Sequence, residues 1–320
     1  MKRVLVVWYS QSGQLRDIVE SIAEPLAQSN EIELTMAQIR PVKPYPFPWS
    51  FWRFFDTFPE CIYADPEPIL PLDIAADSKY DLIILAYQVW FISPSLPTMA
   101  FLQSDQAKKL LNDTPVITVI GCRNMWLMAQ ERMKEFLNQV GARLIDNVAL
   151  AERTHGAISV ITTPWWLLSG NRGPYLKGLL PRAGVWESDI NAASRFGKSI
   201  ALQLPYRDND DARPMLFGLG AVTVHPGLIS SELIVRRSFR LWGALLRACG
   251  KPGMKLRRLV LGFYILFLIA MLLTIVPVVF VLKTLLTPIT RARIARQREK
   301  FAAPSGESME KILRQVEFKA

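Results

Sequence analysis

The sequence is poor in the residues that build disulfides, metal centres and histidine-based catalytic sites. Its 320 residues include three cysteines, Cys61, Cys122 and Cys249, and two histidines. An odd number of dispersed cysteines supports neither a disulfide framework nor a zinc site, and it is typical of a reducing compartment. We therefore expect no metal. The N-terminal apolar run is also too short for a signal peptide.

Acidic residues are scarce in one part of the chain, residues 233–300. That segment holds fourteen Lys and Arg and one acidic residue, within a protein whose net charge is +10. It also contains the most apolar run of the sequence. Basic residues that flank an apolar run favour a membrane with anionic lipids as the partner and argue against nucleic acid.

The chain begins with an apolar run, a short polar loop and a helical pattern. Residues 4–9 predict a buried parallel strand, and apolar residues at helical spacing from Leu15 to Leu26 predict a helix that opens near Gly13. Between them lies the loop Ser10-Gln11-Ser12-Gly13-Gln14. Loop amides, two serine hydroxyls and a helix N-terminus together predict an anion site.

This loop contains neither Gly-x-Gly-x-x-Gly nor Gly-Lys-Ser/Thr. Its Ser-x-Ser-Gly-x pattern resembles the phosphate loop of flavodoxins and related FMN enzymes, although Leu15 stands where that family has a Thr. The resemblance implies FMN as the cofactor, with the phosphate at residues 10–14. An ordinary β-turn-α joint with polar turn residues is the alternative.

Four more predicted strands follow, at residues 32–37, 80–86, 115–121 and 142–150, with helices between them at about 98–111 and 126–140. Alternation of this kind predicts a parallel sheet with right-handed crossovers, whose ligands bind at the carboxyl ends of the strands. The flavodoxin resemblance implies a doubly wound, five-stranded parallel sheet in the order 2-1-3-4-5.

The loops after the third and fourth predicted strands meet the first loop at that edge. The stretch YQVWFISPSLPTMAFL, from Tyr87, looks like the second flavin loop of FMN-dependent quinone reductases. Tyr87, Trp90 and Trp126 are candidates to flank the isoalloxazine, and core packing is the alternative for each. The residues of these two loops that the resemblance implies for FMN are Tyr87, Gln88, Val89, Trp90, Gly121, Cys122, Arg123, Asn124 and Trp126.

Two insertions interrupt the predicted flavodoxin-like domain, which covers residues 1–204. The first, 41–71, is rich in proline and aromatic residues, and the second, 151–187, holds His155 and a Pro-Trp-Trp cluster. We expect both to build over the flavin side of the sheet. For 41–71 the alternatives are a satellite core patch or a second membrane-touching surface.

The rest of the chain predicts a membrane anchor. After a linker at 205–232, residues 233–250 form an interfacial amphipathic pattern, 255–286 a membrane segment and 287–320 a basic amphipathic tail. Residues 259–282 carry no charge and, at about 1.5 Å per residue, span a bilayer core of about 30 Å. A straight span and a re-entrant hairpin bent at Pro277 both remain open. We expect the inner membrane, with the flavin domain in the cytoplasm.

Three functions fit these features: a membrane-anchored FMN-dependent oxidoreductase on a lipid-like substrate, a membrane-bound NAD(P)H:quinone reductase, or a flavodoxin-type electron carrier. The opening VLVVWYSQSGQL and the hydrophobic C-terminal extension resemble the bacterial family called dialkylresorcinol condensing enzyme. That resemblance implies an aromatase that oxidises an alkylated cyclohexanedione, with a ketosynthase as partner. His155 and Tyr87 are the candidates for proton transfer.

Overall fold

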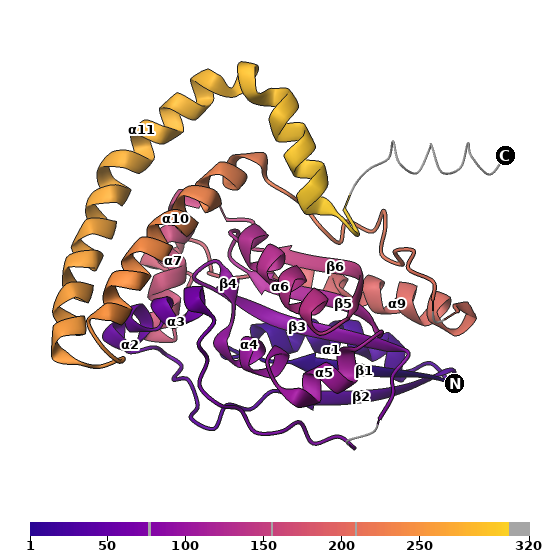
Figure 1. Ribbon diagram of the computed structural model, residues 1–320. Helices are drawn as coiled ribbons and strands as arrows, with labels where there is room; N and C mark the ends of the chain where they lie inside the picture. The colour runs from indigo at the N-terminus through magenta and orange to yellow at the C-terminus, as the bar shows by residue number, and fades with distance from the viewer. Residues whose placement is uncertain (76–77, 155, 209, 307–320) are drawn as a thin grey trace.

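The computed structural model describes residues 1–75, 78–154, 156–208 and 210–306, and a parallel sheet lies at its centre (Figure 1). The five long strands are β1 (Lys2–Trp8), β2 (Ile32–Gln38), β3 (Leu82–Trp90), β5 (Pro115–Cys122) and β6 (Arg143–Ala151). They pair in parallel in the order β2-β1-β3-β5-β6. The two-residue β4 (Ser93–Pro94) pairs antiparallel with the end of β3. The predicted α/β parallel sheet is confirmed. With β4 left out of the count, the strand order is that of flavodoxin.

Helices cover both faces of this sheet. In Figure 1, α4 (Leu96–Leu102), α5 (Asp105–Leu111) and α6 (Leu127–Gln139) lie in front of the strands, and α1 (Gln14–Ala27) and α9 (Ser194–Gln203) lie behind them. The central strands are therefore buried on both sides, which is why β1 and β3 are almost continuously apolar. The short α8 (Glu187–Ala192) precedes α9 and also contacts α1.

One glycine sets how closely α1 and α9 pack. A Cβ at Gly197 of α9 would lie 2.0 Å from the carbonyl oxygen of Ile22 in α1. Only a residue without a side chain allows this approach.

The single helix predicted at 98–111 is wrong, because the structure has two helices there. α4 ends at Leu102, and Ser104 begins α5 by accepting a hydrogen bond from the Ala107 amide at 3.1 Å. A serine in this position caps a new helix instead of continuing the old one.

Both insertions contain helices. The first forms α2 (Phe51–Asp56) and α3 (Phe58–Tyr63), and the second forms the apolar α7 (Gly156–Ser169) and the short η1 (Leu176–Gly178). The two insertions touch: the Trp49 amide donates to the Leu167 carbonyl at 2.8 Å. They therefore form one continuous cover.

The segment after α9 packs along the free edge of the sheet. Following η2 (Leu204–Tyr206), the amides of Met215 and Leu216 donate to the buried Asp146 carboxylate of β6 at 2.7 and 3.2 Å. The Ala149 amide donates to the Ala221 carbonyl at 2.8 Å. This part of the expected linker is thus held against β6.

Two long helices follow, α10 (Pro226–Ala248) and α11 (Lys255–Ala302). In α10, Phe239 and Trp242 of the predicted apolar face pack inward, whereas Leu241 and Ile234 are exposed. Among the described residues, α11 is the one helix long and apolar enough to cross a membrane, and its span Lys255–Thr274 has a mean hydropathy of 2.1. The last part of the predicted basic tail, residues 307–320, lies outside the described residues.

Candidate functional site

A cleft opens at the carboxyl ends of β1, β3, β5 and β6, beneath the two insertions. Its volume, with the open solvent at its mouth included, is about 840 Å³. The strand-end loops contribute its floor, and both insertions contribute its walls. The lining residues are Gln11, Ser12, Gln14, Leu15, Trp49, Phe54, Gln88, Val89, Trp90, Phe91, Gly121, Cys122, Arg123, Glu152, Thr163, Trp166, Leu167 and Gly184.

The loop at residues 10–14, the hydroxyl loop, presents hydrogen-bond donors at one end of this cleft. Gly13 has a φ of 88° and caps α1, and the first intrahelical bond runs from the Asp17 amide to the Gly13 carbonyl at 3.2 Å. The amides at positions 13–16 therefore have no acceptor within the helix. The Ser10 hydroxyl is buried and has no hydrogen-bond partner among the described residues. Such a set of donors at a helix N-terminus is suited to an anion.

Two glutamines of this loop fix its position. The Gln11 amide donates to Gln88 Oε1 at 3.1 Å, and Gln11 Oε1 accepts from Trp49 Nε1, also at 3.1 Å. Gln14 exchanges two hydrogen bonds with the backbone of Val185. The loop is thereby bound to the second strand-end loop and to both insertions.

Aromatic rings form the walls of the cleft. Trp90 packs edge-on against Trp49 and Tyr45, with centroid distances of 5.4 and 5.0 Å. Trp166 of α7 stands in another wall and contacts Phe47 at 6.1 Å. Flat apolar walls near an anion site suit a planar ligand that carries a phosphate.

The end of β5 and the residue after it contribute Gly121 and two ionisable groups, Cys122 and Arg123. A Cβ on Gly121 would lie 3.0 Å from Ile18 Cδ1, so glycine keeps β5 close to α1. Burial raises the pKa of the Cys122 thiol well above its ordinary value, so the thiol is neutral. Burial also lowers the pKa of Arg123, an effect that the nearby Glu152 carboxylate opposes.

Glu152, just after β6, lines the cleft although it belongs to no motif in the sequence. Its side chain is 5 % exposed. Oε2 accepts from the Thr163 hydroxyl at 3.1 Å, whereas Oε1 has no hydrogen bond to any described residue. Burial raises the pKa of this carboxyl, and the neighbouring Thr154 and Thr163 hydroxyls partly oppose the shift. A buried carboxyl that lines a cleft, and whose pKa is raised, can take up a proton.

The structure brings together most of the predicted cofactor residues, but not all of them. Gln11, Ser12 and Gln14, with Gln88 to Trp90 and 121–123, line the cleft, and Ser10 and Gly13 belong to the loop beside it. Trp126 is buried before α6 and Asn124 accepts from Arg123, and neither lines the cleft.

The structure describes one of the two residues predicted for proton transfer, Tyr87, and does not describe the other, His155. Tyr87 is fully buried, and its hydroxyl donates to Gln130 Oε1 at 2.7 Å. The structure therefore does not bring this hydroxyl to the cleft. His155 lies outside the described residues.

Comparisons with known proteins add a description of similar folds. No family model matches the chain, and no curated protein matches it. A flavoprotein from Lactobacillus acidophilus, solved in complex with FMN, shares 22% identity over 46% of this chain and 92% of its own, with a TM-score of 0.37. A flavodoxin from the domain Archaea shares 12% identity over 64% of this chain and 100% of its own (TM-score 0.34). A flavodoxin, WrbA-like protein from Agrobacterium tumefaciens shares 14% identity over 63% of this chain and 96% of its own, with a TM-score of 0.34.

The strand order and the cleft define the class of this protein independently of those likenesses. It is a doubly wound α/β protein in the flavodoxin strand order, with a ligand cleft at the carboxyl edge of its sheet. Two insertions cover that cleft, and a long apolar helix follows.

Proposed function

We propose that this protein is an FMN-dependent oxidoreductase that acts on a hydrophobic, lipid-like substrate and is anchored in a membrane. The observation that carries the proposal is the combination of one cleft with a loop of hydrogen-bond donors at one end and aromatic walls along its length. A flavin mononucleotide requires both features, a site for a phosphate dianion and a slot for a planar ring.

The phosphate is assigned to the loop at residues 10–14. The amides at the start of α1, the buried Ser10 hydroxyl and the Ser12 hydroxyl supply the donors. No lysine is required, because the helix N-terminus itself favours negative charge. The ring is assigned to the cleft beside Trp90 and Gly121, where FMN supplies a hydride acceptor.

Glu152 is assigned as the base that accepts a proton from the substrate. When a carbon–carbon bond of a substrate is oxidised, one carbon loses a hydride to the flavin and its neighbour loses a proton. Glu152 lines the cleft and its buried Oε1 has no hydrogen bond to a described residue, whereas the Cys122 thiol is neutral and the Tyr87 hydroxyl is bonded to Gln130. The nearby Arg123 stabilises the carboxylate before it takes the proton.

A continuous run of aromatic rings supports a lipid-like substrate. Phe54 and Phe91 line the cleft with their ring centroids 5.0 Å apart. Phe91 contacts Phe58 at 6.0 Å, and Phe58 contacts Tyr264 of α11 at 4.6 Å. These packed apolar rings join the cleft to the proposed anchor. An alkyl chain bound in the cleft would gain about 0.8 kcal/mol per buried methylene.

The finer proposal is aromatisation of an alkylated cyclohexane-1,3-dione to a dialkylresorcinol, at the inner membrane with the α/β unit in the cytoplasm. It draws on the family resemblance of the N-terminal sequence and on the basic flanks of α11. The membrane supplies the alkylated substrate, and a ketosynthase is the class of enzyme that makes its precursor.

The test is anaerobic. Detergent-purified protein should show flavin absorbance, and an alkylated cyclohexane-1,3-dione should bleach it. If the dione leaves the flavin oxidised while NAD(P)H bleaches it and a quinone restores it, the protein is a quinone reductase. Bleaching by neither, with exchange of electrons only with a redox protein, would indicate a carrier, and a colourless protein would remove the flavin proposal.

A further inference from the structure

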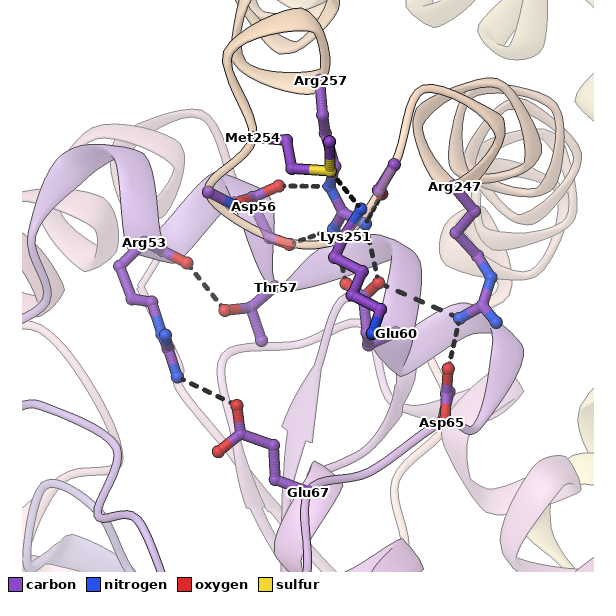
Figure 2. A network of polar contacts seen from close by, with 12 residues as sticks. Arg53, Asp56, Thr57, Glu60, Asp65, Glu67, Arg247, Lys251, Met254 and Arg257 are labelled. Atoms are coloured by element: carbon purple, nitrogen blue, oxygen red, sulfur yellow. Dashed lines mark hydrogen bonds and ion pairs between the residues drawn. The ribbon is translucent and has the colours of Figure 1, made fainter.

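The first turn of α11 is locked to the first insertion by a buried arginine. Arg257 is 1 % exposed and is surrounded by acceptors (Figure 2). Its Nε donates to Asp56 Oδ1 at 2.6 Å, and its two Nη atoms donate to the two Glu60 carboxylate oxygens at 2.9 and 2.7 Å. Backbone carbonyls of Asp56 and Gly250 take further hydrogen bonds. A buried guanidinium needs such complete pairing, so this contact fixes where α11 begins.

The turn before α11 and the end of α10 join the same acidic pair. The Gly253 amide donates to Asp56 Oδ2 at 2.7 Å. Arg247 of α10 lies 3.9 Å from Glu60 Oε1 and 2.9 Å from Asp65 Oδ2. Figure 2 shows its side chain directed toward both carboxylates. The start of α11 is therefore part of the folded α/β unit with its insertions.

The other end of α11 is docked on the sheet. Phe301 and Ala302 are buried in the main core. Just beyond them, the Ser305 hydroxyl donates to Asp146 Oδ1 at 2.7 Å and accepts from the Asn147 amide at 2.6 Å. Both partners belong to β6 and are fully buried. The end of α11 is thus held against β6, the last strand in the order of the sheet.

These two attachments restrict the path of the helix. The 48 residues of α11 have a contour length of about 72 Å, and the uncharged run at 259–282 lies between the attached ends. Figure 1 shows α11 leaving the region of α2 and α3, arching over α10 and returning toward β6. A single crossing would place the two ends on opposite sides of about 30 Å of hydrocarbon, and one attachment would then be lost.

We infer that α11 is a one-sided membrane anchor, which enters and leaves the bilayer on the face where the α/β unit lies. This inference rests on the membrane attachment proposed above. Exposed apolar residues near the first attachment, Leu259, Phe263 and Leu266, supply the bilayer contact. The basic residues on both flanks then lie on one side of the membrane, as the positive-inside rule requires.

The test is site-specific labelling in sealed inside-out membrane vesicles. In a background in which Cys61, Cys122 and Cys249 are alanine, single cysteines are introduced as Lys255→Cys and Lys300→Cys. Lys109→Cys, exposed on α5, is the matched control for the α/β unit. A membrane-impermeant maleimide should label all three from the same side, without detergent.

Labelling of Lys300→Cys only after detergent, with Lys255→Cys and Lys109→Cys labelled before it, would show a single crossing and overturn the inference. Release of the protein from the vesicles by alkaline carbonate would also overturn it. Flavin content is measured on vesicles that contain the parent protein, in which the cleft residue Cys122 is retained. Absence of flavin there, with same-side labelling of the variants, would count against the proposed function and leave the topology supported.

Discussion

Gln14 and Val185, 171 positions apart in the sequence, exchange a reciprocal pair of hydrogen bonds. Gln14 Nε2 donates to the Val185 carbonyl at 3.0 Å, and the Val185 amide donates to Gln14 Oε1 at 2.9 Å. The Gln14 side chain therefore connects the start of α1 to the second insertion through both of its polar atoms. The second insertion, which forms one wall of the cleft, is therefore hydrogen-bonded to the loop at residues 10–14.

Replacing Gln14 by Ala should loosen the second insertion. The substitution leaves the buried Val185 amide unpaired, and we expect a loss of roughly 1–3 kcal/mol in the free energy of unfolding. Amide hydrogen exchange at Val185 should rise as well. Gln28→Ala, at the exposed end of α1, is the control and should change neither quantity. Unaltered exchange in the Gln14 variant would show that the insertion is held by other contacts.

The double substitution Ser10→Ala plus Ser12→Ala should weaken FMN binding. Removal of two donors to a phosphate dianion costs about 3 kcal/mol, or roughly 150-fold in Kd. Fluorescence titration of apoprotein with FMN measures this change. Ser29→Ala, beyond α1, is the control. Equal affinity of the double variant and the parent would remove the phosphate assignment.

Glu152→Gln should slow flavin reduction by the dione while FMN remains bound. The amide has nearly the same shape but cannot accept the proton, and a positioned base contributes about 10²- to 10⁴-fold in rate. Stopped-flow absorbance at a fixed flavin content measures the rate. Glu187→Gln, an exposed carboxyl of α8, should have the parent rate. Full activity of the Glu152→Gln variant would assign the proton to another group.

Glu232 should make the stability depend on pH. It is buried on α10, accepts from the Leu127 and Met128 amides at 3.3 and 2.8 Å, and burial raises its pKa from 4.5 to about 7. Between these two values the folded protein binds a proton that the unfolded chain does not. The stability contribution is therefore present below pH 4.5 and is lost as pH rises through 7, by about 3 kcal/mol.

The measurement is chemical unfolding of the parent and of Glu232→Gln from pH 4.5 to 8. The free energy of unfolding of the parent, minus that of the variant, should fall across this range. Asp146, whose pKa burial raises to about 6, acts in the same direction but cancels because both proteins contain it. A pH-independent difference would mean that Glu232 keeps its charge when folded.

The local parts of this fold could be predicted from the sequence. The apolar run at 4–9 and the helical spacing after it predict β1 and α1, because strand and helix patterns are set by neighbouring residues. The loop between them was recognisable for the same reason.

Features that depend on distant contacts could not be predicted. Glu152 belongs to no motif, and it becomes a buried cleft residue only when α7 brings Thr163 against it. Arg257 has the appearance of a basic residue flanking a membrane segment, yet its partner Asp56 lies 201 positions away. The break between α4 and α5 depends on one capping serine within an otherwise helical pattern.

Because α11 lies near the end of the chain, it is synthesised after the residues that hold its two ends. The two carboxylates that hold α11 at its ends, Asp56 and Asp146, precede it in the chain. At roughly 5–20 residues per second, translation from the end of α9 to the end of α11 takes about 5–20 s, and domains fold as units during this time. On this timescale the α/β unit can fold before the whole of α11 has been made. The anchoring proposed above would then bring α11 to the bilayer from the side on which the α/β unit lies, after translation of that unit is complete.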